Sequence, residues 1–147
     1  MLAPVKDCSS DIVFVLDDSR SIGSSNFARI KSFLSQLVTR LDIDSGMTSV
    51  GVVTYSSAVR TRYYLNYYNS VAAVQSAISR LTYSAGSTNN MANALSYVRR
   101  YVLTSARGDR SNAPNIVVLL TTGRSTNTSA TQVCIMLIML QKNFTFQ

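Results

Sequence analysis

Two uninterrupted apolar runs most restrict the fold that this chain can adopt. Ile12–Leu16 and the stretch NIVVLL at residues 115–120 are short and rich in β-branched residues. Runs of this kind are typical of strands that are covered on both faces of a parallel sheet. We therefore expect the first to be a central strand and the second to be fully buried as well.

Between these runs, apolar residues recur at helical spacing and predict three amphipathic helices. The first would follow an N-cap at Ser24 or Ser25 and run to about Leu41. The buried stripes would be Phe27, Ile30, Leu34, Leu37 and Leu41, then Val71, Val74, Ile78 and Leu81, then Met91, Leu95, Val98 and Val102.

Residues 48–57 also have the composition of a strand, and residues 59–64 alternate as in the edge strand of a hairpin. Strands that alternate with helices predict an α/β fold. We expect a three-layer, doubly wound and mostly parallel sheet with one antiparallel edge strand.

Composition argues for one domain without enzymatic activity. The chain has 147 residues, 46% of them hydrophobic, which is enough for a single core. It contains neither histidine nor glutamate, so its seven aspartates are the only carboxylate side chains available for general acid–base catalysis.

The net charge of +7 can favour acidic partners, including nucleic acid and sulfated glycans. Most of the arginines are scattered, and only 99–100 and 107–110 hold them close together. We therefore expect a generally basic surface and no nucleic-acid partner, with polyanion binding as an alternative that salt would weaken steeply.

The cysteines and the ends of the chain leave several alternatives open. Cys8 and Cys134 could form one disulfide or remain free thiols, and the position of Cys134 in an apolar run favours a buried thiol. The first ten residues lack the apolar core of a signal peptide, and Val133–Leu140 is too short to span a bilayer. The chain is therefore either intracellular or an excerpt.

Three oxygen-rich loops should meet at the carboxyl edge of the predicted sheet, where ligands of such sheets bind. They are 17–21, 87–90 and 121–125. In the first, Asp17, Ser19 and Ser21 alternate along a tight turn, so their side chains can face one point. Hard cations such as Mg²⁺ take carboxylate, hydroxyl and water oxygens of this kind.

Four blocks in the same order resemble the von Willebrand factor type A domain of integrin inserted domains, matrilins and type VI collagen. The blocks are DIVFVLDDSRSIG, SVGVVTYSS, GSTNNMANAL and NIVVLLTTGRS. The resemblance covers 8–132 and leaves 133–147 as an atypical tail. Because the family continues with a further strand and helix, it implies a C-terminally truncated domain.

The resemblance also implies a metal-ion-dependent adhesion site, in which a partner's acidic residue completes the shell of Mg²⁺ or Mn²⁺. Asp17 would hold the ion through water, Ser19 and Ser21 directly, and Thr88 in the ligand-bound shape. The family's last metal-site aspartate is replaced here by Thr122, which removes a charge and predicts weak binding or none.

Neighbouring charges suggest a second way to bind an anion at this edge. Arg20 and Arg124 could take it directly by charge-assisted hydrogen bonds. Asp18 could pair with Arg20 at the surface, or it could restore a carboxylate to the metal site if it turned toward the ion, against the alternation of the turn.

The function that the resemblance implies is adhesion: an extracellular, secreted module that binds collagen or another matrix protein through an acidic residue, without a membrane span. One alternative is a structural matrix component with a vestigial metal site. Phosphate chemistry around an ion at Asp17 is a weaker third reading. Two short motifs add possible sites: integrin recognition at Arg107, Gly108 and Asp109, and glycosylation at Asn127 and Asn143.

Overall fold

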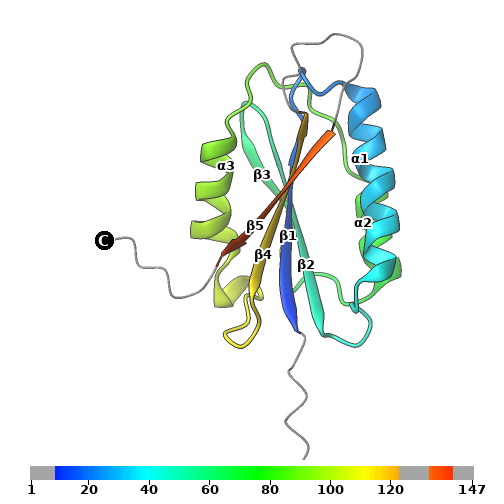
Figure 1. Cartoon of the computed structure of the whole chain (residues 1–147), viewed down its shortest axis with the longest axis vertical. Coiled ribbons are helices and arrows are strands. Elements are labelled where there is room, and N and C mark those ends of the chain that lie inside the picture. The colour runs from blue at the N-terminus through cyan, green and yellow to red at the C-terminus, as the bar shows by residue number, and fades with distance from the viewer. Residues whose placement is uncertain (1–8, 123–132, 141–147) are drawn as a thin grey trace, which may run out of the picture.

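A five-stranded mixed sheet forms the centre of the molecule (Figure 1). The computed structural model describes residues 9–122 and 133–140, with the backbone alone for Thr122 and for 133–140. The strands are β1 (Ser10–Asp17), β2 (Thr48–Tyr55), β3 (Val59–Tyr63), β4 (Asn115–Thr122) and β5 (Val133–Leu140), in the spatial order β3-β2-β1-β4-β5. β1 pairs in parallel with β2 and β4, and β3 and β5 are antiparallel edge strands.

Helices cover both faces of the sheet and give three layers. One face carries α1 (Ser24–Leu37), which continues as the 3-10 turn η1 (Val38–Arg40), and α2 (Val71–Ser79). The other carries α3 (Met91–Tyr97) and the π-helical turn η2 (Val98–Val102), followed by the short turn η3 (Ser105–Arg107). Among the described residues, no helix has the length and apolar character needed to cross a lipid bilayer.

The core lies in two parts because successive residues of β1 point to opposite faces of the sheet. Phe14 and Leu16 pack in the cluster beneath α1 and α2, and Val13 and Val15 pack in the cluster beneath α3. All four side chains are buried. The predicted three-layer fold with a central first strand is confirmed.

Two local features differ from what the sequence predicted. The N-cap of α1 is Gly23 at φ 77°, a backbone conformation that favours glycine, and Ser24 already lies inside the helix. An N-cap at Ser24 or Ser25 was therefore wrong. Residues 133–140, assigned to an atypical tail, form β5 and add a second antiparallel edge strand.

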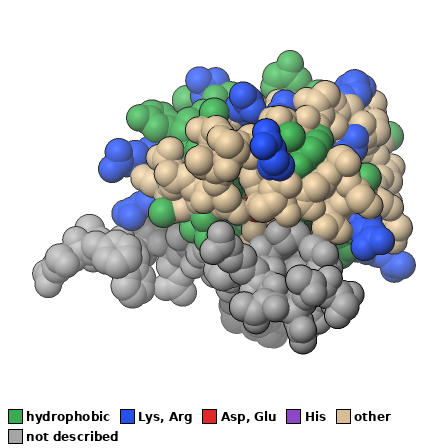
Figure 2. All heavy atoms as spheres, turned by 90° about the horizontal axis from the view of Figure 1, so that it is seen from above, with side chains coloured by type: hydrophobic (Ala, Val, Ile, Leu, Met, Phe, Trp, Pro, Cys, Tyr) green, Lys and Arg blue, Asp and Glu red, His purple; other side chains and the backbone are tan. Residues whose placement is uncertain are grey.

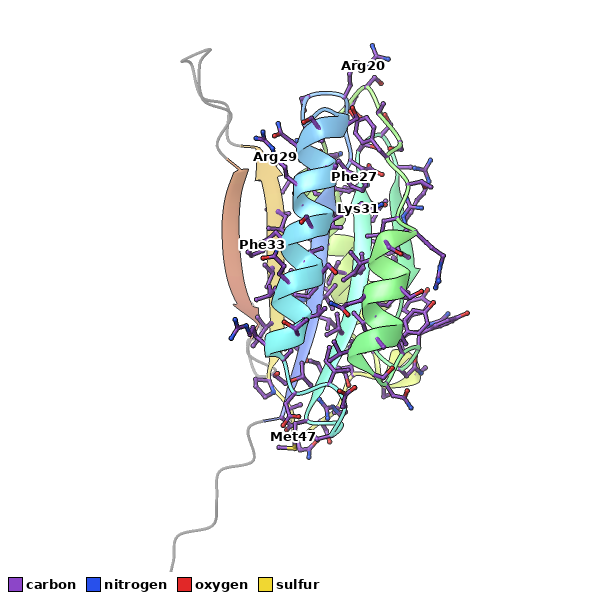
Figure 3. The ribbon with its side chains drawn as sticks, turned by 90° about the vertical axis from the view of Figure 1, so that its right-hand side faces the viewer. Arg20, Phe27, Arg29, Lys31, Phe33 and Met47 are labelled. Carbon is purple, nitrogen blue, oxygen red and sulfur yellow. The ribbon has the colours of Figure 1, made fainter. Side chains whose placement is uncertain are left out.

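Lysine and arginine side chains join distant segments through backbone carbonyls. Lys31, which extends from α1 toward α2 in Figure 3, donates to the carbonyls of Ser79 and Leu81 at 2.7 and 2.9 Å. At the amino edge of the sheet, Arg110 pairs with buried Asp11 at 2.8 Å and donates to the carbonyl of Met47. The Arg110 contacts fix the loops at the amino edge, opposite the predicted site, whereas Lys31 ties α1 to the end of α2.

Two tyrosines on β2 and β3 are buried deeply enough to perturb their phenols. Burial raises the pKa of Tyr55 to about 12. Burial also raises the pKa of Tyr63 far above its usual range, with a further contribution from neighbouring Tyr68. The folded state therefore favours the neutral form of both side chains.

We expect the free energy of unfolding to fall as the pH rises above about 10, the usual pKa of tyrosine. Stabilisation by a phenol with a raised pKa is complete below that pH and is lost as the pH rises toward the folded-state pKa. In urea titrations over this range, Tyr63→Phe should lose less stability than the native chain. Tyr67→Phe, at a side chain 67% exposed, is the control and should behave as the native chain does. If Tyr63→Phe and the native chain lost the same stability at alkaline pH, the raised pKa of Tyr63 would be contradicted.

Candidate metal and ligand site at the carboxyl edge

Asp17, the last residue of β1, lies at the centre of the carboxyl edge. Its side chain is 0% exposed, and protein groups already hold both of its oxygens. Oδ1 accepts the backbone N–H of Ser19 at 2.9 Å, which closes an Asx-type turn. Oδ2 accepts the Asn89 side-chain amide at 2.6 Å and the Thr121 hydroxyl at 2.9 Å. Three donors, from the turn after β1, the loop before α3 and the end of β4, therefore converge on one carboxylate.

The hydroxyls of Ser19 and Ser21 lie beside each other on the same turn. Their Oγ atoms are 2.7 Å apart and share a hydrogen bond. Ser19 is buried and Ser21 is exposed, so the pair connects the interior with the surface. The D-x-S-x-S spacing thus brings Ser19 and Ser21 together, as the sequence predicted.

The loop before α3 is fastened to this turn along its backbone. Tyr83 donates its hydroxyl to the Ser19 carbonyl at 3.0 Å, and the Arg20 N–H donates to the Gly86 carbonyl at 2.8 Å. Gly86 packs so closely that a Cβ would come within 2.9 Å of the backbone nitrogen of Ser57. The absence of a side chain at Gly86 therefore allows the loop before α3 to pack against the turn between β2 and β3.

Thr88 lies on this loop with its side chain exposed. Its backbone N–H donates to Ser57 Oγ at 3.4 Å, and within the described residues its hydroxyl makes no hydrogen bond. Thr122 ends β4 beside β1, but its side chain is not described, and Arg124 lies outside the described residues. The structure thus brings Asp17, Ser19 and Ser21 together and leaves the Thr88 hydroxyl facing solvent.

Asp18 and Arg20 do not pair, which corrects the sequence-based expectation. Asp18 is 0% exposed, because the strand alternation turns it to the face opposite Asp17. Arg62 of β3 is its partner: a guanidinium nitrogen lies 3.5 Å from Oδ2, beyond good hydrogen-bonding geometry. Arg20 is exposed and projects above the edge in Figure 3.

The view onto the carboxyl edge in Figure 2 shows cationic and hydrophobic side chains among uncharged side chains and backbone. No acidic side chain is visible on this face among the residues that are coloured. Both aspartates of the edge, Asp17 and Asp18, are fully buried. The surface that a partner would meet is therefore neutral to positive.

Comparisons with known proteins identify the family. The family model of the von Willebrand factor type A domain matches residues 11–142. The chain belongs to this family.

Matrix proteins are among the relatives of this von Willebrand factor type A domain. In Mus musculus it is 38% identical over 122 residues to von Willebrand factor A domain-containing protein 2, 34% over 116 residues to matrilin-3, and 39% over 120 residues to the collagen alpha-4(VI) chain. These alignments cover 83%, 78% and 80% of this chain but only 15%, 24% and 5% of the relatives. The chain therefore spans a small part of their length.

The type A domain is also similar to solved structures of proximal thread matrix protein 1 from the mussel byssus. One has a TM-score of 0.74 and 27% identity, and covers 82% of this chain and 32% of that chain. Another, described as having a zinc occupied MIDAS motif, has a TM-score of 0.74 and 25% identity over 84% of this chain and 33% of that chain.

The residues of this type A domain fit a divalent cation in geometry but carry little charge for it. Neighbouring oxygen ligands of Mg²⁺ lie roughly 3 Å apart, close to the 2.7 Å between Ser19 Oγ and Ser21 Oγ. Asp17 uses three of about four acceptor positions, so one remains for a metal-bound water. Within the described ranges, no group of three or more acidic, cysteine or histidine side chains could hold a metal.

Two residues of the site, Asn89 and Thr121, were not predicted as its donors. Thr121 was expected only as part of the loop 121–125, but its hydroxyl donates to Asp17 across 104 positions of the chain. Asn89 follows Thr88 directly in the predicted loop. Its side-chain amide, a hydrogen-bond donor at the carboxyl edge, was the signal in the sequence that could have identified it. Sequence alone did not show that it would reach back 72 positions to Asp17.

The Arg-Gly-Asp motif lies away from the carboxyl edge, and the two glycosylation motifs lie outside the described residues. Arg107 of the Arg-Gly-Asp sequence lies over the Tyr64 ring at 4.2 Å, and Gly108 adopts φ 97° against the backbone of Asn66. Integrin recognition by Arg107, Gly108 and Asp109 stays a prediction. Asn127 and Asn143 lie outside the described residues.

Replacing Asp17 should destabilise the domain even without metal. In Asp17→Asn an NH₂ group replaces one carboxylate oxygen. This group would face N–H or O–H donors whose hydrogen bonds the native carboxylate accepts. We expect the free energy of unfolding in urea and EDTA to fall by about 2 kcal/mol. The matched change Asp42→Asn, at an exposed side chain, should stay within about 0.5 kcal/mol. If Asp17→Asn left the metal-free domain as stable as before, Asp17 would serve only as a ligand and the account would be wrong.

Proposed function

We propose that this domain is a non-enzymatic interaction module of the extracellular matrix that binds an acidic residue of a matrix protein at the carboxyl edge. The observation that carries the proposal is the Asp17 turn, with Ser19 and Ser21 side by side beneath a face that shows no acidic side chain among the described residues. Such a face attracts carboxylates and does not repel them. Collagen is a candidate ligand.

The metal site in this proposal is degenerate. Asp17, Ser19, Ser21, Thr88 and Thr122 would hold Mg²⁺ or Mn²⁺, with one carboxylate among them. A bound ion would supply positive charge and an open position to a partner's carboxylate. Because affinity for hard cations grows with the number of charged ligands, the exchange of aspartate for Thr122 makes binding weak.

Arg20 offers the partner a contact that needs no metal. It is exposed beside the Ser19–Ser21 pair, and its carboxylate neighbour Asp18 faces the other way and pairs with Arg62. A guanidinium can take a carboxylate through two parallel hydrogen bonds. Arg124, two residues beyond β4, is proposed to contribute in the same way.

The similarity to matrilin-3 and the collagen alpha-4(VI) chain supports an extracellular location. Secretion would make glycosylation at Asn127 and Asn143 possible. The absence of histidine and glutamate from the chain supports a binding role over catalysis.

A second candidate is a structural component of an assembled matrix, in which the metal site is vestigial. The similarity to a matrix protein of the mussel byssus favours it. In that case the domain would pack through its surfaces, and divalent cations would not affect its association.

Calorimetric titration with Mg²⁺ and Mn²⁺ tests the site. The native chain should bind weakly, and Thr122→Asp should bind at least about tenfold more tightly, since it restores a charged ligand. Thr122→Asn is the matched control, because it has the same shape without the charge and should not gain affinity. Adding Ser19→Ala to Thr122→Asp should remove the gain.

Binding to a collagen-coated surface then separates the two candidates. The interaction module predicts binding that Arg20→Gln weakens and that Mg²⁺ strengthens in Thr122→Asp. The proposal fails if Thr122→Asp gains no metal affinity and Arg20→Gln leaves binding unchanged.

A further inference from the structure

A groove lined by tyrosine and arginine lies on the α3 side of the molecule. It has a volume of about 310 Å³ and is lined by Tyr64, Tyr97, Arg100, Tyr101, Thr104 and Arg107. These residues come from the segment after β3, from the end of α3 and η2, and from the turn before β4. They lie at the end of α3 away from the Asp17 turn (Figure 1).

The walls of the groove are held in place before any ligand arrives. The rings of Tyr97 and Tyr101 lie 5.1 Å apart, and the Tyr97 hydroxyl accepts a hydrogen bond from Thr61 at 3.1 Å. The Arg107 guanidinium lies 4.2 Å from the centre of the Tyr64 ring. A surface with fixed side chains loses little conformational entropy on binding.

The turn that carries Arg107 is also fixed. The Arg107 backbone N–H donates to the Thr104 carbonyl at 2.9 Å. Gly108, at φ 97°, packs so closely against Asn66 that a Cβ on Gly108 would lie 2.6 Å from the Asn66 backbone nitrogen. The position of Arg107 over the groove therefore follows from the backbone as well as from the ring.

The charge of the groove is positive and uncompensated. Arg100 and Arg107 are exposed, and neither has an ion-pair partner within the described residues. Among the residues that the structure describes, no acidic side chain lines the groove. An arginine over an aromatic ring still has N–H groups at its edge, which can hold a carboxylate through two hydrogen bonds.

We propose that this groove docks an acidic, aromatic-containing peptide segment of a partner protein. Tyrosine and arginine are enriched where proteins bind one another, and Tyr101 is an aromatic side chain left 56% exposed. Two arginines at one hollow match one or two carboxylates of a peptide. A long polyanion would instead need an extended basic stripe, and outside 99–100 and 107–110 the arginines of this chain are scattered.

This site is independent of the function proposed for the carboxyl edge, since it lies at the other end of the domain and uses no metal. Variants of Ser19 or Thr122 should leave it unchanged. Variants of the groove should leave metal binding unchanged.

Fluorescence anisotropy with a fluorescein-labelled peptide of alternating glutamate and tyrosine tests the groove, in EDTA. We expect Arg107→Gln and Arg100→Gln each to weaken binding about tenfold, the effect of losing a hydrogen bond between charged groups. Tyr101→Ala should weaken it as well. The same peptide with glutamine in place of glutamate should bind poorly.

Arg29→Gln is the matched control, since it removes the same charge from an exposed position on α1, across the sheet from the groove (Figure 3). It should leave the affinity unchanged. The proposal is overturned if Arg29→Gln weakens binding as much as Arg107→Gln does, because the attraction would then come from net charge. It is also overturned if the peptide does not bind while heparin does and the groove variants weaken heparin binding.

Discussion

The carboxyl edge of this domain depends on the buried charge of Asp17. A carboxylate without exposure to water is costly unless it accepts hydrogen bonds, and here three donors meet that need. The donors belong to the turn after β1, the loop before α3 and the end of β4. Asp17 therefore joins the three segments around it through hydrogen bonds.

This arrangement explains how the carboxyl edge can keep its shape through protein contacts alone. The Ser19–Ser21 pair and the contact of Arg20 with Gly86 require the turn after β1 and the loop before α3 to hold fixed relative positions. The hydrogen bonds that Asp17 accepts from both segments fix those positions. The second aspartate of the edge faces the other side of the sheet, where Arg62 of β3 lies 3.5 Å from it. The edge therefore has two buried carboxylates and a surface on which Arg20 is exposed.

The sequence predicted the fold well where the physical signal is local. The apolar run of β1 and the stripe of α1 are read from neighbouring residues, and both were confirmed. The entry to α1 was missed because Gly23 adopts a left-handed conformation there. β5 was missed because its apolar run consists mostly of methionine, leucine and cysteine and lacks the enrichment in β-branched residues that marked β1 and β4. Asn89, Thr121 and the partner of Asp18 could not be predicted, since their contacts depend on which distant side chains share a face.

Hydrogen exchange of the Ser19 backbone amide tests most directly whether Asp17 organises the edge without metal. The amide donates to Asp17 Oδ1 within a buried turn. The account predicts slow exchange in EDTA, little further slowing in Mg²⁺, and fast exchange in Asp17→Asn. Fast exchange of the native chain in EDTA that becomes slow only when Mg²⁺ is added would contradict it, because the metal would then be what forms the turn.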